Sequence, residues 1–491
     1  GAHRRCRVNS MQLLAVIPLV PLLAVLAVLA AARWPNVREA ASVLAGVLLF
    51  GLVVTLVGQV DSQAAPTLVL AEPLPGLTLA LSPEPLGMLF ALVASFLWPV
   101  TTVYAIGYMR AHHEENQTRF YAAFAVSIAA TMGIALSANM LTLFLFYELL
   151  TLSTYPLVTH AGDDDARRGG RVYLGLLMST SIFFLLLAMI WTWQLTGTLT
   201  FTAGGVFGAS VDPTILSVLL VLYVFGTGKA AMMPFHRWLP AAMVAPTPVS
   251  ALLHAVAVVK AGVFTILKVA VYLFGIDLIG QLAVADWLAA LAALTILLAS
   301  LVAMTRDNLK ARLAYSTVSQ LGYITLGAML GVAAGVVGGG MHIVMHAFGK
   351  ITLFFCAGAI LVAAHKNRVS ELDGLGRRMP LTMLAFLIGA LSIVGLPPFG
   401  GTWSKWLLVQ GTLDAGMWLL TATLLVSSLL NIMYLVVIPV RGFFAKPAGD
   451  NQGLQEAPIA SLLAIGVAVL GCIVLFFMPE PVYQMMEGVF R

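Results

Sequence analysis

The sequence predicts an all-α protein that crosses a membrane about 14 times, and three observations lead to this fold class. Of the 491 residues, 60% are hydrophobic and only 10% are charged, whereas a soluble domain has about 25% charged residues. A helix needs roughly 20 apolar residues to span a bilayer, and such stretches recur along the whole chain. Basic residues gather in alternate connections between these stretches.

Fourteen stretches are long and apolar enough to be spans. They lie at 12–32, 39–59, 86–107, 119–137, 139–160, 171–195, 213–233, 247–273, 285–304, 311–332, 335–363, 380–409, 415–440 and 457–478. Two short alternating runs flank Glu72-Pro-Leu-Pro-Gly between the second and third stretches, which predicts a hairpin outside the bilayer. The first stretch is too long for a cleaved signal peptide, so we expect it to remain as a span.

The basic residues predict the orientation. With an even number of spans, both termini lie on one side, and the loops on that side contain no Lys or Arg. The opposite loops contain Arg33, Arg38, Arg110, Arg119, Arg167, Arg168, Arg171, Arg237, Arg306, Lys310, Arg312, Lys366, Arg368, Arg377, Arg378, Arg441 and Lys446. By the positive-inside rule these loops are cytoplasmic and both termini face outward. The basic N-terminal tail departs from this pattern, and we expect residues 1–10 to be an upstream extension.

A small set of ionisable residues is left inside the predicted helices. The lysines are Lys229, Lys260, Lys268, Lys350 and Lys405. The other groups are His254, His342, His346 and Glu148, which we expect to be the only buried acid. A charge at the bilayer centre costs about 2.5–3.5 kcal/mol, so such residues are functional candidates by default. Lysine, histidine and glutamate can exchange protons when buried, whereas arginine stays charged.

A structural role is the alternative for each of these residues. Lys268 lies near the outer end of its helix, where snorkelling to the membrane surface is as good an explanation as function. His342, His346 and Lys350 are spaced at i, i+4 and i+8, so they share one helical face. A lone buried histidine is more often structural, but three titratable groups on one stripe favour a proton wire.

Two of the lysines have helix-breaking residues beside them. Lys229 precedes Pro234, and Lys405 follows Pro397 and Pro398. A proline leaves backbone carbonyls without partners, and membrane helices tolerate such breaks where they line a hydrated cavity or are buried in protein. Both stretches continue with Pro-Phe, Trp and Leu, five helices apart, which indicates an internal repeat of the transporter kind. Simple hinge prolines would also explain the pattern.

Cofactor motifs are missing from the sequence. The three cysteines are Cys6, Cys356 and Cys472, and their wide spacing argues against iron–sulfur, structural zinc and c-type haem sites. There is no GxGxxG after a strand and no Walker A loop. We therefore expect no cofactor, no bound metal and no nucleic-acid partner, and a secondary ion transporter subunit rather than an enzyme.

Four sequence runs resemble a known family. They are Phe146-Tyr-Glu148-Leu-Leu, the run from Gly228 to His254, the run from Arg306 to Gly322, and His346-Ala-Phe-Gly-Lys350. The chain resembles, over nearly its whole length, the antiporter-like subunits of respiratory complex I, membrane-bound hydrogenases and Mrp-type multisubunit cation/proton antiporters. The resemblance implies 14 helices with two inverted five-helix repeats.

The resemblance also implies a domain plan and a role for each residue. The parts are an extension at 1–10, three helices and the hairpin at 11–118, repeats at 119–273 and 285–440, and a C-terminal helix at 441–491. Glu148 looks like the acid that pairs with Lys229. The proton path then continues through His254, Lys260, His342, His346 and Lys350 to the terminal lysine, Lys405.

Two features favour the D subunit of an Mrp-type antiporter within this family. The chain shows no lateral helix after its fourteenth span, and Lys405 stands where the complex I subunit of similar length usually has glutamate. We expect partner membrane subunits, a bacterial inner membrane, and protons as the transported ion, with Na⁺ as the coupled candidate. The alternatives are a proton-pumping subunit of complex I or a hydrogenase, a non-conducting structural subunit, and an accessory to bicarbonate uptake.

Overall fold

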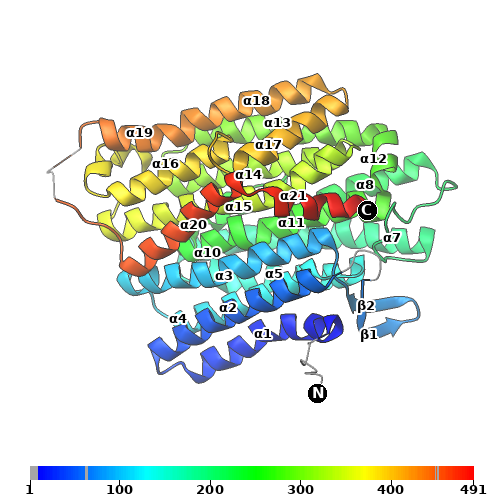
Figure 1. Ribbon diagram of the computed structural model, residues 1–491, viewed down its shortest axis with the longest axis horizontal. Helices are drawn as coiled ribbons and strands as arrows, with labels where there is room; N and C mark the ends of the chain where they lie inside the picture. Colours follow the sequence, from blue (N-terminus) through cyan, green and yellow to red (C-terminus); the bar gives the residue numbers. More distant parts are fainter. Residues whose placement is uncertain (1–8, 61–64, 448, 450–452) are drawn as a thin grey trace, which may run out of the picture.

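The computed structural model describes residues 9–60, 65–447, 449 and 453–491, and within these ranges the chain forms a bundle of helices (Figure 1). The helices run roughly along one common direction, with helix α1 at one margin of the bundle and helix α18 at the opposite margin. This arrangement confirms the predicted all-α polytopic fold. Residues 1–8 of the predicted extension lie outside the described residues, and the side chain of Asn9 caps the first helix by accepting a hydrogen bond from Gln12 N at 2.8 Å.

The predicted hairpin is present at one end of the bundle (Figure 1). The N-terminal elements are α1 (Ser10–Ala30), α2 (Pro35–Gln59), β1 (Leu68–Leu74), β2 (Leu77–Leu81) and α3 (Pro85–Ala111). The two strands pair antiparallel, with Leu68 opposite Leu81 and Leu74 opposite Leu77. Gly76 closes the turn at a φ of +82°, a conformation that glycine adopts without a steric cost.

The middle of the chain contains the first broken helix. Its elements are α4 (Gln117–Ala135), α5 (Met140–Val158), α6 (Asp164–Thr180), η1 (Ser181–Leu186), α7 (Leu187–Thr196), α8 (Pro213–Gly226), η2 (Gly228–Ala230), α9 (Trp238–Ala241), η3 (Ala242–Val244), α10 (Thr247–Ala251), η4 (Leu252–Val256), α11 (Val258–Lys268), η5 (Val269–Phe274) and α12 (Ile276–Gln281). The helices α6 and α7 are continuous through the π-helical turn η1, and α10 and α11 are joined through η4.

The last part of the chain contains the second broken helix. Its elements are α13 (Ala283–Thr305), α14 (Leu309–Met329), α15 (Ala333–Ala364), η6 (Val369–Glu371), η7 (Leu375–Arg377), α16 (Pro380–Val394), α17 (Gly401–Asp414), α18 (Trp418–Asn431), η8 (Ile432–Val436), α19 (Val437–Phe444), α20 (Ile459–Phe477), α21 (Glu480–Glu487) and η9 (Gly488–Phe490). The chain ends on the side of the bundle that carries the hairpin (Figure 1).

Among the described residues, 11 helices are long and apolar enough to cross a membrane by themselves. The three other predicted spans, 213–233, 311–332 and 380–409, correspond to the shorter helix α8, to α14 with its polar buried face, and to the pair α16 and α17. Each of these segments departs from a continuous apolar helix, so the full count of fourteen spans stays a prediction.

Both predicted helix breaks are present. Helix α8 ends at Gly226, and regular helix resumes only at Trp238, whose Nε1 donates a 2.8 Å hydrogen bond to the carbonyl of Gly228. Helix α16 ends at Val394 and is capped by Gly395 with a φ of +92°, and α17 begins at Gly401. The Met233–Pro234 and Pro397–Pro398 peptide bonds are cis. The breaks leave Lys229 and Lys405 beside irregular backbone.

The segment from α10 to η5 is the innermost part of the bundle. Its apolar window is completely buried, and that of α15 is 89% buried, whereas that of α2 is only 28% buried. Figure 1 shows α11, α14 and α15 in the middle of the bundle. Ionisable residues on these helices therefore face protein, and their charges must be balanced within the chain.

Gly262 lets α11 lie directly against the first helix break. A Cβ at this position would overlap backbone atoms of Lys229 and Ala230. We expect Gly262→Ala to destabilise the protein by about 1–3 kcal/mol, as overpacking does in a tight core, even though alanine is the better helix former. The measurement is the thermal unfolding midpoint in detergent. Gly175→Ala is the matched control, because nothing lies within 4 Å of its Cβ; equal midpoints for both variants would contradict the prediction.

Candidate functional site

The predicted ionisable residues lie in the interior of the bundle. The fully buried ones, with at most 1% of their surface exposed, are Lys229, His254, Lys260, His342, His346 and Lys350. Lys405 is 8% exposed and Glu148 is half-buried. They come from both halves of the chain, and their contacts divide them into two groups.

Lys229 is held by neutral oxygen atoms of helix α5. Its Nζ donates a 2.8 Å hydrogen bond to the carbonyl of Tyr147 and a second bond to the hydroxyl of Thr151. The same Nζ lies 3.4 Å from the centre of the Tyr147 ring, within reach of a cation–π interaction. The hydroxyl of Tyr147 accepts a 3.2 Å hydrogen bond from the backbone N–H of Lys229. Tyr147 therefore binds both the side chain and the backbone of this lysine.

Glu148 is separate from Lys229 in this structure. Both carboxylate oxygens are buried without a hydrogen-bond partner, and among the described residues Glu148 forms no ion pair within 4.0 Å. Lys229 and Ser181 are the groups near enough to act on its charge. The expected pair is therefore open, with the lysine bound to α5 backbone and hydroxyl groups instead of the carboxylate.

The second group begins at Lys260. Its Nζ forms a 2.5 Å hydrogen bond with Nδ1 of His346 on α15. One turn away, the ring of His342 lies 5.8 Å from that of His346, centre to centre. The predicted stripe on α15 therefore faces α11, and it connects a lysine of the predicted first repeat with residues of the predicted second repeat.

His342 continues this group toward the second helix break. Its Nδ1 is hydrogen-bonded to Ser404 Oγ at 2.8 Å, next to Lys405 in the chain, and its Nε2 to Gln320 Oε1 at 2.9 Å. Its ring stacks on Tyr323, 5.5 Å away. The hydroxyl of Tyr323 in turn accepts a long hydrogen bond, 3.5 Å, from Lys405 Nζ.

Lys405 closes the row at the break between α16 and α17. Its Nζ donates to the carbonyl of Val394 at 3.1 Å and to Ser428 Oγ at 3.2 Å. A cavity of about 490 Å³ lies beside it. The cavity is also lined by the exposed side chains of Trp406, Leu425 and Leu429, so it reaches the outer apolar surface of the bundle.

His254 and Lys350 flank this row. Lys350 donates a 2.6 Å hydrogen bond to Ser316 Oγ. His254 packs on Phe354, with ring centres 4.4 Å apart, and neither of its ring nitrogens has a hydrogen-bond partner. Lys260, Lys310 and Lys350 lie near enough to act on the charge of His254.

The two groups are not connected by hydrogen bonds between their side chains in the described part of the chain. The nearest link is the packing of Gly262 in α11, two residues after Lys260, on the backbone of Lys229. The row predicted from sequence as one path is thus interrupted between Lys229 and Lys260.

A polar cavity opens at the end of the bundle that carries the basic connections. It measures about 270 Å³, and its lining includes His112, Glu114, Thr247 and Lys310. Thr247 lies on the segment that continues to Ser250 and His254, at i+3 and i+7 on one helical face. Ser250 Oγ has no hydrogen-bond partner either. Buried polar atoms nearly always have partners, so ordered water is expected along this face.

Two acids correct the prediction that Glu148 is the only buried one. Glu39 near the start of α2 is 3% exposed and forms an ion pair with Arg110. Glu84, at the N-cap of α3, is partly buried and accepts hydrogen bonds from Lys268 at 3.0 Å and from the hydroxyl of Tyr272 at 2.7 Å. Lys268 therefore has a carboxylate partner and does not reach out to the membrane surface.

Sequence reasoning missed the neutral partners of the row. The missed residues are Tyr147, Thr151, Ser316, Gln320, Tyr323, Ser404 and Ser428. Part of this set was detectable, because Ser316, Gln320 and Tyr323 recur at i, i+4 and i+7 on one face of an otherwise apolar helix.

Residues 137–431 match the family described as NADH:quinone oxidoreductase/Mrp antiporter, TM. The chain belongs to this family. The match begins just before α5 and ends with α18, so it includes both helix breaks and every residue of the row. As a member of this family, the chain is an integral, multi-pass membrane protein.

Relatives come from both branches of the NADH:quinone oxidoreductase/Mrp family. NADH-quinone oxidoreductase subunit N of Desulforudis audaxviator (strain MP104C) is 35% identical over 409 residues, 78% of this chain and 80% of that protein. A protein of Rhizobium meliloti (strain 1021), described as part of a probable K⁺/H⁺ antiporter, is 30% identical over 415 residues, 82% of this chain and 40% of that protein. The chain spans about half the length of its relatives of the NAD(P)H-quinone oxidoreductase chain 5 type.

Two solved structures have the same fold. A chain of the membrane-bound sulfane sulfur reductase, an archaeal respiratory membrane complex, matches with a TM-score of 0.84 at 24% identity, over 97% of this chain and 96% of that one. A chain of the Mrp complex from Dietzia sp. DQ12-45-1b matches with a TM-score of 0.82 at 21% identity, over 98% and 97%.

The contact of Lys229 with Thr151 can be tested by Thr151→Val, which removes the hydroxyl and keeps the shape. Hydrogen bonds to charged groups contribute about 1.5–3 kcal/mol to stability, so we expect the variant to be destabilised by about this amount, measured as a fall in the thermal unfolding midpoint in detergent. Thr265→Val is the matched control, since the buried Thr265 hydroxyl bonds only to Ala261 O of its own helix. An unfolding midpoint of Thr151→Val equal to that of the unchanged protein would show that this contact does not stabilise the structure.

Proposed function

We propose that this chain is the proton-translocating subunit of a multisubunit cation/proton antiporter, of the Mrp D type, in a bacterial inner membrane. The observation that carries the proposal is the continuous set of contacts from Lys260 through His346, His342 and Tyr323 to Lys405. Membrane proteins bury such groups mainly along ion pathways. The set contains no carboxylate, so it suits a proton better than a metal cation.

In this proposal the first half of the path is a switch. Lys229 alternates between the oxygen atoms of Tyr147 and Thr151, which it contacts in this structure, and the carboxylate of Glu148. Contact with the carboxylate stabilises the ammonium, and its loss favours release of the proton in a low-dielectric site. The two inverted five-helix repeats, 119–273 and 285–440, would then each supply one broken helix with its lysine.

Proton uptake would use the polar cavity with Glu114 and Lys310. From Thr247, water along Ser250 would bring the proton to His254, whose ring nitrogens are free to bind it. His254 would pass it to Lys260, and the α15 histidines would carry it to Lys405. The cavity beside Lys405 reaches the lateral apolar surface, which suits coverage by a membrane protein partner.

A redox-driven role is the second candidate. The 35% identity with NADH-quinone oxidoreductase subunit N, over 80% of that protein, favours a proton-pumping subunit of a complex I-like or hydrogenase-like assembly. The row would work in the same way there, but electron transfer elsewhere in the assembly would drive it. Lysine at position 405 favours the antiporter, as does the likeness to the K⁺/H⁺ antiporter protein.

Native purification with identification of the co-purifying chains separates these two candidates. For the antiporter we expect partner membrane subunits without flavin or iron–sulfur absorbance, and proton flux in vesicles that depends on a Na⁺ or K⁺ gradient. Flavin or iron–sulfur absorbance, together with flux that requires a redox substrate, would overturn the antiporter in favour of the redox-driven pump.

The switch is tested by Glu148→Ala and Lys229→Ala. Each variant removes one partner of the proposed alternation, so we expect at least a 100-fold loss of proton flux, equivalent to about 2.8 kcal/mol. Assembly with the partner subunits should persist, because Glu148 makes no hydrogen bond in the described part of the chain and Lys229 exposes no surface to a partner subunit. Lys268→Ala serves as the control within the same set of lysines. Near-normal flux in either switch variant would exclude the mechanism.

A further inference from the structure

A large cavity, lined by no residue of the buried row, lies at the ends of the first helices. It measures about 1090 Å³, and its lining comes from α1, α2, α3, α4 and α5. The positive-inside rule predicts this end of the helices to be cytoplasmic. The cavity shares no lining residue with the polar uptake cavity.

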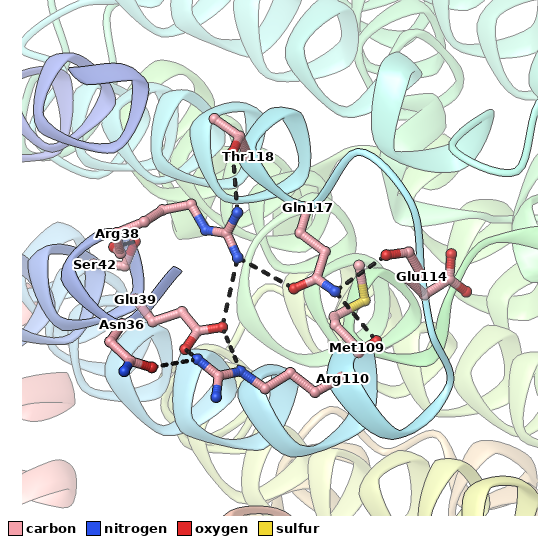
Figure 2. Close-up of polar contacts among 9 residues, drawn as sticks. All are labelled: Asn36, Arg38, Glu39, Ser42, Met109, Arg110, Glu114, Gln117 and Thr118. Atoms are coloured by element: carbon pink, nitrogen blue, oxygen red, sulfur yellow. Dashed lines mark hydrogen bonds and ion pairs between the residues drawn. The ribbon is translucent and has the colours of Figure 1, made fainter. Parts of the chain in front are cut away.

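Three arginines and no acid line this cavity: Arg38, Arg110 and Arg119. Figure 2 shows the guanidinium groups of Arg38 and Arg110 converging on the carboxylate of Glu39, with Asn36, Gln117 and Thr118 around them. Glu39 balances one of the three positive charges. The cluster therefore keeps a net charge of +2, and among the described residues Arg119 is the one arginine of the three that forms no ion pair with a carboxylate.

Arg38 is the buried member of the cluster. Only 6% of its surface is exposed, and it donates to Thr118 Oγ1 at 3.0 Å and to Gln117 Oε1 at 3.2 Å. Its Nε is buried without a hydrogen-bond partner. Arg38 therefore contributes a buried positive charge to the wall of the cavity, while its Nε is covered by protein.

Arg110 and Arg119 have donors to spare. The Arg110 side chain is 46% exposed although it pairs with Glu39 and Asn36. Arg119 is exposed, and its single hydrogen bond goes to the carbonyl of His160 at 3.2 Å. Arginine is the preferred partner of phosphate groups, because its planar guanidinium can donate two parallel hydrogen bonds.

The other wall of the cavity is apolar. Leu29, Ala122, Ala123, Val126 and Pro156 line it, and they belong to membrane-spanning helices. Leu29 is 53% exposed, so this wall continues onto the lipid-facing surface. The cavity thus has a basic end and an apolar side, which is the distribution of a phospholipid headgroup and its acyl chain.

We propose that this cavity is a binding site for one anionic phospholipid. Its phosphate lies among the three arginines, and an acyl chain follows the wall formed by Leu29 and Val126. Basic pockets between membrane helices on the cytoplasmic side recognise acidic headgroups in this way. The lipid fills the wedge between α1, α2 and α4, and it fixes the N-terminal helices to the five-helix repeat that begins at residue 119.

Native mass spectrometry of the full chain with its co-purifying subunits tests the site. After delipidation, phosphatidylglycerol and phosphatidylcholine with the same acyl chains are titrated back, and we expect selective retention of one phosphatidylglycerol. Arg119→Gln should weaken its binding about fivefold, since a basic residue near an anionic membrane surface contributes about 1 kcal/mol. Arg119→Lys should largely restore binding. Arg171→Gln is the control, as an exposed arginine that does not line the cavity.

Three results would overturn the proposal. Equal retention of the two lipids would show that the site does not select for the negative charge of the headgroup. Displacement of phosphatidylglycerol by millimolar inorganic phosphate would make the site one for the free anion. Unchanged lipid binding in Arg119→Gln, with loss of a co-purifying chain, would assign the arginines to a protein interface. The titration of the wild-type protein with the two lipids does not depend on the folding of any variant. That measurement alone can therefore refute the proposal.

Discussion

The structure depends on how the buried interior of the bundle accommodates ammonium groups that have almost no carboxylates beside them. The lysines of the row are held by neutral acceptors: Lys229 by a carbonyl and a hydroxyl, Lys350 by a serine, and Lys405 by a carbonyl and hydroxyls. A lysine held in this way can lose its proton without leaving an unpaired carboxylate behind. Lys268 differs, because its partner is Glu84, and a pair of this kind stabilises the charged form. The contrast favours a structural role for Lys268.

The helix breaks and the buried lysines are structurally related. A break leaves backbone carbonyls without their helical donors, and at the end of α16 the carbonyl of Val394 accepts from Lys405. At the other break Lys229 lies in the irregular segment itself, and its ammonium reaches across to α5. An unbroken helix from α16 to α17 would bury Lys405 without the free carbonyl of Val394, so at this break the position of the prolines and that of the lysine depend on each other.

Much of this was predictable from the sequence, because it rests on features that are rare in membrane spans. Buried lysines and histidines stand out, prolines mark breaks, and alternating basic loops order the helices. The neutral partners could not be assigned, since threonine and serine usually bond to their own helix, as Thr265 does. Thr151 does the same, with a 3.3 Å hydrogen bond to the carbonyl of Tyr147, and its further contact with Lys229 appears only in the folded structure. The depth of Glu39 was misjudged for a similar reason: it lies near the start of a helix, and only packing against α3 buries it.

The missing hydrogen-bonded connection between Lys229 and Lys260, among the described residues, could not be predicted from the order of these residues in the sequence. A continuous row would let a proton cross the protein without any coupling, whereas an interrupted one needs a step in which the two groups are joined. That step lies where Gly262 packs on the backbone of Lys229, so the position of the η2 turn and that of α11 are mechanically linked. Any partner that moves α8 would also move this contact, and the open arrangement of Glu148 and Lys229 would change with it. Coupling to a driving force is therefore best sought at the α8 break, because Lys260, His346 and His342 are already in contact without it.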